Sequence, residues 1–430
     1  MWALVDCDNF FCSCERIFRP ELKRTPVVVL SNNDGCVVAM SKEAKAMGIK
    51  MGTPYYQVKQ EFPGDIPVAF SSNYILYGDI SRRIMLILRE FSPSVYQYSI
   101  DEAMMDLTGI DHARLKEFGE QLAARVYKWV GAPVSVGIAP TKTLAKVAVR
   151  YAKKYPAYRK CCLIGSDEQL RKALADFPVE DVWGIGRRIA ASLRQYNILT
   201  AADFVARPRE WVKKRYHITG ERTWRELRGE DVIDIREMET TRKSIMTSRS
   251  FPGMITELKE LRTHVANYAA RCAAKLRRQQ SVCAQLMVFV QSNFFREDLP
   301  QYSHSWFTTF PTPTSTTTDI VEAALKVLAM IYRPGIHYKR AGVMVSDISQ
   351  ATRLQPDLFT YDPDRRAKLN YVSSAIDSVN LRHGPDTVIL GAQQYSQIGA
   401  DGKHIHFQYA IRRDLKSPDY STNINAFHIR

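Results

Sequence analysis

The sequence lacks long apolar runs, and its cysteines are too scattered to organise a fold. No stretch approaches the roughly 20 apolar residues that a membrane-spanning helix needs, so we expect no membrane segment. MWALVDCDNFF at the start holds neither a basic leader nor a cleavage signal, which favours a cytoplasmic protein. The eight cysteines should then be reduced thiols. Cys12-x-Cys14 has no matching second pair of ligands, so we expect no zinc site.

Acidic residues are also fewer than basic ones. The chain has 430 residues, with 60 Lys and Arg against 45 Asp and Glu, for a formal net charge of +15. The basic residues recur in short groups, such as those at 82–84, 152–160, 213–215 and 275–279. This spread suits several modest contacts to a phosphate backbone and favours a nucleic-acid-binding protein, although solubility alone would also account for the charge.

The N-terminal part alternates short apolar strands with amphipathic helices. The expected order is strand 2–5, helix 8–18 with Asp8 or Asn9 as its N-cap, hairpin 25–40, helices 42–47, 55–61 and 75–89, strands 94–100 and 103–107, helix 115–130, strand 133–139 and basic helix 141–155. This is the βαββαβ order of a ferredoxin-like unit with an insertion near its start. The sequence therefore predicts an α+β fold.

Three further regions follow. Residues 165–232 have the pattern of a compact helical domain, and the polar stretch 233–242 is typical of a tether. Residues 243–348 predict a second α+β unit, with strand, helix 258–279, strand 283–290, a polar Pro/Thr/Ser loop, helix 319–331 and strand 339–345. After about 350 we expect loops or disorder, with one helix near 366–379.

Two adjacent acids, Asp101 and Glu102, interrupt the apolar stretch YSIDEAMMDL. The ferredoxin-like pairing would place the first strand, ending at Asp6, beside them. Successive side chains of a regular strand face opposite ways, so a turn or bulge between Tyr98 and Ala103 is needed for all three to converge. Converging carboxylates repel unless cations neutralise them, and oxygen ligands suit a pair of Mg²⁺ ions. The alternative is a solvated turn.

Several motifs together resemble one family. YSIDEAMMDLTG, VDCDNFFCSCE, VSVGIAPTKTLAKVA and VWGIGRR are similar to the Y-family translesion DNA polymerases. SNNDGCVVAMSKEAKAMGIKMG and SSNYILYGDISRR narrow the resemblance to the UmuC branch, the catalytic subunits of bacterial DNA polymerase V. The resemblance runs from residue 1 to about 360. It implies template-directed, error-prone DNA synthesis in the SOS response to DNA damage, by attack of a primer 3′-hydroxyl on a deoxynucleoside triphosphate.

The resemblance also implies a domain plan with the following boundaries: palm, 1–10 and 74–164; inserted fingers, 11–73; thumb with a helix-hairpin-helix, 165–232; linker, 233–242; little finger, 243–349; C-terminal tail, 350–430, with a clamp-binding motif and possible partner contacts.

Site residues follow from the same resemblance. Asp6, Asp101 and Glu102 are expected as catalytic metal ligands, together with the backbone carbonyl of Cys7. They would hold two Mg²⁺ ions, for which Mn²⁺ can substitute. Asp8 is expected to cap the first helix and not to bind metal.

The nucleotide pocket is implied in the same way. Phe11 matches the steric gate that excludes a 2′-hydroxyl, whereas Phe10 is a core residue that offers its backbone N–H to the triphosphate. Cys36 and Val38 match the roof over the nascent base pair, and Lys153 matches a phosphate-contacting lysine. Lys42 and Lys45 stand where many relatives carry Tyr and Arg, and ordinary solvated lysines are the alternative for these two.

Contacts to DNA and partners complete the expectations. Gly184, Gly186 and Arg187 would approach a phosphate at a helix start, unless the segment is a simple helical corner. Further DNA contacts are expected from Arg242, Lys243 and Ser244. Gln355, Leu358 and Phe359 in LQPDLF resemble a sliding-clamp motif. A processed UmuD-type dimer, RecA and a place at the nucleoid during DNA damage are implied by the resemblance alone.

Two other functions remain open from the residues. A two-metal nuclease would use a similar acid cluster but needs no nucleotide pocket. A non-catalytic DNA-binding subunit would not need the acids at all.

Overall fold

The chain folds as two compact units. The computed structural model describes residues 1–235, 242–353, 356, 361–394, 396–398, 404–406, 412–418 and 420. One unit comprises Met1–Glu239 with Arg412–Arg430, and the other comprises Thr240–Ile411. The division falls inside the expected linker 233–242, whereas the expected tail 350–430 contributes to both units. The clamp motif of Gln355, Leu358 and Phe359 lies outside the described residues.

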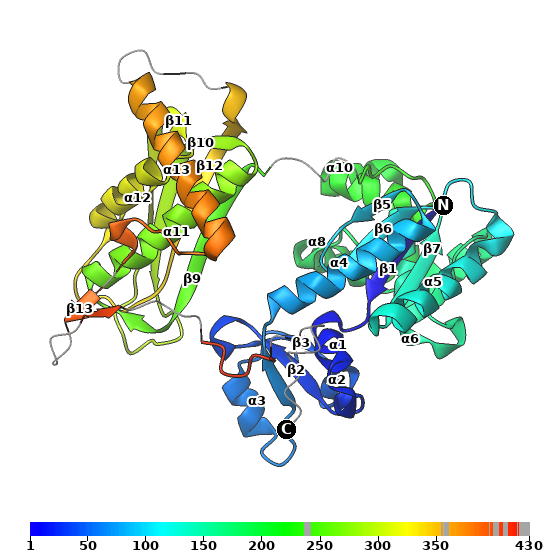
Figure 1. Ribbon diagram of the computed structural model, residues 1–430. Coiled ribbons are helices and arrows are strands. Elements are labelled where there is room, and N and C mark those ends of the chain that lie inside the picture. The colour runs from blue at the N-terminus through cyan, green and yellow to red at the C-terminus, as the bar shows by residue number, and fades with distance from the viewer. Residues whose placement is uncertain are drawn as a thin grey trace. The chain divides into compact units, whose positions relative to one another are not determined.

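A five-stranded sheet organises the first unit, in the order β5 (Val95–Gln97), β6 (Glu102–Asp106), β1 (Trp2–Cys7), β7 (Val134–Ala139) and β8 (Cys161–Leu163). Strand β1 runs antiparallel to both β6 and β7, while β8 is parallel to β7. Figure 1 shows β5, β6, β1 and β7 side by side. The ferredoxin-like α+β fold is confirmed, with β8 as an added edge strand.

Helices cover both faces of this sheet because β1 is apolar on both sides. Ala3 and Val5 pack in one core with α4 (Tyr74–Phe91) and α5 (Leu115–Val130). Leu4 faces the other way and packs with α6 (Lys142–Lys154). Thr141 caps α6, since its side chain accepts a hydrogen bond from the Leu144 N–H. Alternation along β1 thus fixes α6 beneath the strand that ends in Asp6 and Cys7.

The insertion forms a small sheet of its own. It contains α1 (Phe10–Ile17), β2 (Val27–Leu30), β3 (Val37–Met40), α2 (Lys42–Ala46), α3 (Tyr55–Glu61) and β4 (Val68–Ser71). Strand β2 pairs antiparallel with β3, as the predicted hairpin requires, and parallel with β4. A separate apolar cluster holds this sheet against α2 and α3.

Four helices follow the palm-like sheet: α7 (Asp167–Ala175), α8 (Arg187–Gln195), α9 (Ala201–Val205) and α10 (Arg209–Leu227). Their cores join that of α6. A fully buried carboxylate, Glu226, ties the end of α10 to the start of α6 by accepting from the Thr143 N–H at 3.0 Å. The expected helical domain is confirmed.

The second unit is a four-stranded antiparallel sheet in the order β11, β10, β12, β9. Its elements are β9 (Ser244–Ile255), α11 (Leu258–Arg278), β10 (Ser281–Ser292), β11 (Ser303–Thr314), α12 (Thr317–Ile331) and β12 (Tyr338–Gln350). Apolar side chains of α11 and α12 pack with those of the sheet in one core. The second α+β unit is therefore confirmed.

A polar loop is expected before α12, and this prediction is wrong because Ser303–Thr314 form strand β11. This strand pairs with β10 from Gln291–Ser303 to Gln285–Thr309, and the register then shifts before Cys283–Thr314. Pro311 and Pro313 fall at that shift, on an edge strand, where a missing N–H costs little. Composition concealed the strand because its exposed half needs few apolar residues.

Regular structure continues beyond residue 350. Helix α13 (Pro363–His383) is longer than the expected 366–379. It is held by a paired contact in which both Asp377 oxygens accept from Arg277 at 2.7 Å. Short strands β13 (Ser396–Ile398) and β14 (His404–His406) pair antiparallel. Within the described ranges, no helix is both long and apolar enough to cross a membrane.

Candidate active site

The predicted acids meet at one end of the central sheet. Asp6 on β1 lies directly opposite Glu102 on β6 in the strand register. The Cys7 N–H donates to the Asp101 carbonyl oxygen at 2.9 Å. Asp101 lies in the turn between β5 and β6 and not in a strand, so strand alternation does not force it away from Glu102. The backbone thus brings Asp6, Cys7, Asp101 and Glu102 to the same edge.

Two lysines from α6 neutralise these acids. Lys153 Nζ donates to Asp6 Oδ1, and Lys146 Nζ donates to Glu102 Oε2 at 3.0 Å. The Asp6 side chain is only 16% exposed. Burial raises the pKa of Asp6 to about 7; the charge of Lys153 opposes the shift and that of Glu102 adds to it. The anionic form of Asp6 therefore lacks stabilisation that a further cation would supply.

The donor set suits a hard divalent cation. Carboxylate and carbonyl oxygens are the ligands that Mg²⁺ prefers. Among the residues that the structure describes, no three His, Cys, Asp or Glu side chains converge as ligands of one metal ion. The carboxylates are instead engaged by protein donors: Asp6 and Glu102 by the lysines, and Asp101 by the Ser99 hydroxyl at 2.5 Å. Binding a metal ion here requires these side chains to exchange partners.

Of the two residues predicted as the N-cap of α1, Asn9 is confirmed and Asp8 is wrong. Asn9 occupies the N-cap position with a left-handed backbone (φ 47°) and makes no side-chain cap bond. The buried Asp8 carboxylate instead accepts from Ser135 Oγ at 2.9 Å and from Lys160 Nζ at 2.6 Å. These partners lie more than 120 positions away, and a buried charge takes them in preference to a local cap.

A cavity of about 470 Å³ opens beside the acids. The expected site residues that line it are Asp6, Cys7, Phe10, Phe11, Val38, Lys42, Lys45, Asp101 and Lys153. Glu102 and Cys36 are not among its lining residues. Cys36 lies in the same β2–β3 connection as Val38, where its N–H donates to Ser31 Oγ at 3.1 Å. The cavity joins carboxylates, lysines and an aromatic floor within one space.

Phe11 stands on two tyrosines that the sequence prediction missed. Its ring stacks on that of Tyr77, with centroids 4.4 Å apart and planes 16° apart, and meets the edge of Tyr74 at 5.8 Å. Phe10 is buried in the core, as expected. The spacing of Tyr74 and Tyr77, three apart on one face of α4, is a usable signal for such a platform.

The two lysines of α2 differ in their surroundings. Lys45 Nζ donates to Asn9 Oδ1 at 2.7 Å, which fixes its ammonium group beside the start of α1. Lys42 is exposed at the first position of α2. Both line the cavity, so neither is remote from the acids.

The residues expected to contact DNA lie in exposed segments at the start of a helix or a strand. Gly184 has a φ of +94°, and Gly186 is the N-cap of α8 with no atom within 4 Å of where a Cβ would be. Ile185 between them is buried and anchors the turn, while Arg187 is exposed. The α8 N-terminus is thus open to a phosphate. In the second unit, Arg242 and Lys243 are exposed ahead of β9, which begins at Ser244.

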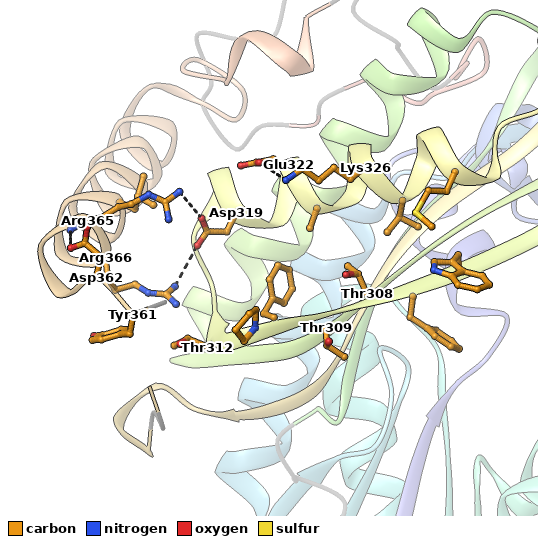
Figure 2. A pocket seen from close by; sticks show the side chains of 18 residues that line it. Thr308, Thr309, Thr312, Asp319, Glu322, Lys326, Tyr361, Asp362, Arg365 and Arg366 are labelled. Carbon is orange, nitrogen blue, oxygen red and sulfur yellow. Dashed lines mark hydrogen bonds and ion pairs between the residues drawn. The ribbon is translucent and has the colours of Figure 1, made fainter. Parts of the chain in front are cut away.

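A larger hollow of about 620 Å³ lies in the second unit between β11, α12 and α13 (Figure 2). Its charged groups are paired: Asp319 lies 3.7 Å from Arg365 and 3.5 Å from Arg366. None of the expected site residues lines it. Size therefore does not single out the cavity beside the acids, because the larger hollow holds none of the residues expected to bind a nucleotide or metal.

Comparisons with known families cover most of the chain. Residues 5–150 match the impB/mucB/samB family and residues 242–358 match its C-terminal domain. Residues 167–198 match the helix-hairpin-helix motif of the same group, and residues 371–427 match a domain of unknown function.

Individual proteins and one solved structure agree with these matches. The chain is 42% identical to protein UmuC of Salmonella typhimurium, over 98% of each chain. It is also 42% identical to protein ImpB of the same organism, over 98% of this chain and 97% of that protein. DNA polymerase IV of Caulobacter vibrioides is 28% identical over 90% of this chain and 93% of that protein. A solved Y-family DNA polymerase chimera of Dbh and Dpo4 is similar in fold, with a TM-score of 0.65 at 21% identity, over 81% of this chain and 99% of that one.

Proposed function

Because this chain belongs to the impB/mucB/samB family, in the UmuC branch of the Y-family DNA polymerases, and is a translesion DNA-directed DNA polymerase, we propose that Asp6, Asp101 and Glu102 are its metal ligands. The enzymes of this family are metal-dependent. The observation that carries the proposal is the β1–β6 register, which sets Asp6 opposite Glu102 while the Asp101 carbonyl accepts from Cys7. Asp6 and Glu102 come from distant segments, and each would be an unpaired partly buried charge without its lysine, so their pairing across β1 and β6 favours a role in binding cations.

The proposed cofactor is a pair of Mg²⁺ ions, with Mn²⁺ as a substitute, held by the three carboxylates and the Cys7 carbonyl. When bound, such ions would lower the pKa of the primer hydroxyl and stabilise the leaving oxygens. Without an ion, Lys146 and Lys153 balance the charge of Glu102 and Asp6. With an ion bound to Asp6, Lys153 would be free to contact the triphosphate. No protein general base is assigned, because positioning and charge stabilisation carry most of such a reaction.

The cavity would receive the incoming nucleotide. Lys42, Lys45 and Lys153 are proposed to bind the phosphates, aided by the backbone N–H of Phe10. Phe11, supported by Tyr77, would lie under the sugar, where its ring leaves no room for a 2′-hydroxyl.

A roof of small side chains is proposed over the base pair. Val38 lines the cavity, and Cys36 lies two residues before it in the same hairpin. Small apolar groups discriminate weakly by shape, so a distorted template base can be accommodated at the cost of fidelity.

DNA contacts and partners extend the proposal. Gly184, Gly186 and Arg187 would bind one backbone phosphate of the primer–template through the α8 N-terminus, and Arg242, Lys243 and Ser244 would bind others. These contacts are sequence-independent, as template-directed synthesis requires.

Membership of the UmuC branch supports further partners. We expect a processed UmuD-type dimer, RecA, and a sliding clamp bound by Gln355, Leu358 and Phe359. The proposed setting is the cytoplasm, at the nucleoid, in the SOS response to DNA damage.

Primer extension with single acid variants tests the proposal. Asp101→Asn and Glu102→Gln keep side-chain size but remove a charge, and each is expected to lower the incorporation rate by at least roughly 10²-fold. Asp176→Asn, at an exposed position of the helical region, is the matched control and should extend primers like the wild type. Wild-type rates in the first two variants would refute the metal-ligand assignment.

The same assay separates the alternatives. With a labelled primer, Mg²⁺ and deoxynucleotides, a polymerase lengthens the strand and a nuclease shortens it. A non-catalytic subunit would do neither, and the acid variants would bind DNA as the wild type does. The cavity of about 470 Å³, lined by Phe11 and lysines, favours the polymerase.

A further inference from the structure

Residues 412–418 lie against the inserted sheet of the first unit (Figure 1). We call residues 412–418 and 420 the C-terminal strap. Its backbone N–H groups at Arg412 and Asp414 donate to Asn33 Oδ1 at 3.1 Å and Asp34 Oδ2 at 2.9 Å. These acceptors belong to the β2–β3 connection. The strap is therefore bound to the segment that also carries Cys36.

A second set of contacts joins the strap to the start of α4. Ser71 N–H at the end of β4 donates to the Leu415 carbonyl at 3.0 Å, and Leu415 N–H donates to Ser71 Oγ at 3.0 Å. Asn73 Nδ2 donates to Ser417 Oγ at 3.0 Å, and Asn73 Oδ1 caps α4. Since Ser417 and Asn73 are both buried, this contact excludes water and fixes the strap on the helix cap.

From Ser417 a chain of buried polar groups leads toward the cavity. Asn73, which donates to Ser417, also accepts from the Tyr77 N–H at 3.0 Å through its backbone carbonyl. Burial raises the pKa of the Glu15 carboxyl, and the hydroxyls of Tyr77 and then Ser417 oppose that rise. Tyr77 Oη donates to Glu15 Oε1 at 2.6 Å, and the Tyr77 ring stacks on Phe11. Glu15 and Tyr77 are fully buried. Within the described residues, Glu15 Oε2 makes no hydrogen bond of standard geometry.

Such an arrangement is costly unless it performs a task. A buried carboxylate with one oxygen left without a hydrogen bond destabilises a fold. An apolar residue at position 15 would pack without that cost. What the carboxylate does provide is a fixed acceptor for the Tyr77 hydroxyl. A tyrosine held at both ring and hydroxyl cannot tilt, and the ring stacked on it is held in turn.

We propose that the C-terminal strap, through Ser417 and Glu15, positions Tyr77 against Phe11 and so sets how strictly the sugar pocket excludes ribonucleotides. This inference rests on the proposed role of Phe11 as the steric gate. Ser417, Glu15 and Tyr77 act as positioning residues, since none of them is required to touch the reacting atoms.

The test measures kcat and KM for one deoxynucleotide and the matching ribonucleotide, using the full chain with Mg²⁺ and primer–template. The measured discrimination is kcat/KM for the deoxynucleotide divided by kcat/KM for the ribonucleotide. Ser417→Ala, Glu15→Ala and Tyr77→Phe should each lower this ratio by roughly tenfold, through a lower KM for the ribonucleotide. A tenfold change corresponds to about 1.4 kcal/mol. The kcat for the deoxynucleotide should stay within about twofold in Ser417→Ala, because the described hydrogen bonds of the strap go to Asn33, Asp34, Ser71 and Asn73 and not to the acids.

Two variants guard against a merely structural effect. Glu15→Gln retains an oxygen acceptor for the tyrosine and should keep wild-type discrimination even if it unfolds more easily. Ser378→Ala on α13 is the matched control, since its exposed hydroxyl bonds only within its own helix among the described contacts, and it should leave discrimination unchanged.

The outcomes separate the strap from the gate. Wild-type discrimination in Ser417→Ala and Glu15→Ala, with discrimination lost in Phe11→Ala, would overturn the strap and leave the gate standing. Unchanged discrimination in Phe11→Ala would overturn both. The Phe11→Ala, Ser417→Ala double variant should lose no more than Phe11→Ala alone, and an additive loss would mean that the strap acts elsewhere.

Discussion

Replacement of Gly137 by alanine should disturb both folding and catalysis. Gly137 lies on β7 beneath α6, and an added Cβ would come closer than 3.0 Å to the Ala145 carbonyl oxygen and the Val149 backbone nitrogen. These are backbone atoms, so no side chain can rotate away, and α6 as a whole must move. Overpacking of this kind costs about 1–3 kcal/mol, and the rigid neighbours place Gly137→Ala near the upper value.

The functional cost follows from what α6 carries. Lys146 and Lys153 on this helix engage Glu102 and Asp6. A shift of about 1 Å in groups that position a reaction can lower its rate by roughly 10²-fold. Gly137→Ala should therefore lower the single-nucleotide incorporation rate even at temperatures where the variant is fully folded.

Urea unfolding and incorporation kinetics on the same preparation provide the assay. Gly78→Ala on α4 is the control, because nothing lies within 4 Å of its Cβ position, and it should stabilise the helix by roughly 0.5–1 kcal/mol. If the free energy of unfolding of Gly137→Ala lay within about 0.5 kcal/mol of the wild-type value, and the variant incorporated nucleotides at the wild-type rate, the close packing of α6 on β7 would not control the site.

Three further predictions concern other parts of the chain. Phe11→Ala should admit ribonucleotides, measured as the ratio of kcat/KM for the two sugars; unchanged discrimination would refute the gate. Burial lowers the pKa of His264 to about 4, so the unfolded chain binds a proton near pH 6.5 that the folded chain does not. The free energy of unfolding should therefore fall by about 3 kcal/mol from pH 6.5 to 4, and His264→Phe should flatten this dependence in urea titrations; an equally steep fall in the variant would assign it to other groups. Replacing Leu358 and Phe359 together by alanine should abolish stimulation by a sliding clamp but leave distributive synthesis intact, and persistent stimulation would remove the motif.

The sequence predicted the meeting of the acids because pattern and topology agree there. Asp6 ends an apolar run, and the βαββαβ order leaves one pairing that sets this strand beside the acidic hairpin. The turn that frees Asp101 from strand alternation was also foreseeable, since two adjacent acids could not otherwise share a site. Local signals suffice where a strand is apolar and the order of elements leaves it one pairing.

Long-range polar contacts could not be predicted in the same way. Asp8 looked like a cap, but its partners Ser135 and Lys160 are set by packing and not by spacing. The contacts of the strap join Arg412 to Asn33 across 379 positions, and no periodicity encodes them. Strand β11 was missed for a different reason, because an exposed edge strand needs little of the apolar alternation by which strands are recognised.

Metal stoichiometry in the assembled complex tests the central claim most directly. The protein would be bound to a primer lacking its 3′-hydroxyl, with template and deoxynucleotide, and titrated with Mn²⁺ while free Mn²⁺ is followed by electron paramagnetic resonance. We predict two tightly bound ions in the wild type and a loss of at least one in Asp6→Ala. Full occupancy in Asp6→Ala would contradict the assignment of the carboxylate trio as the metal site.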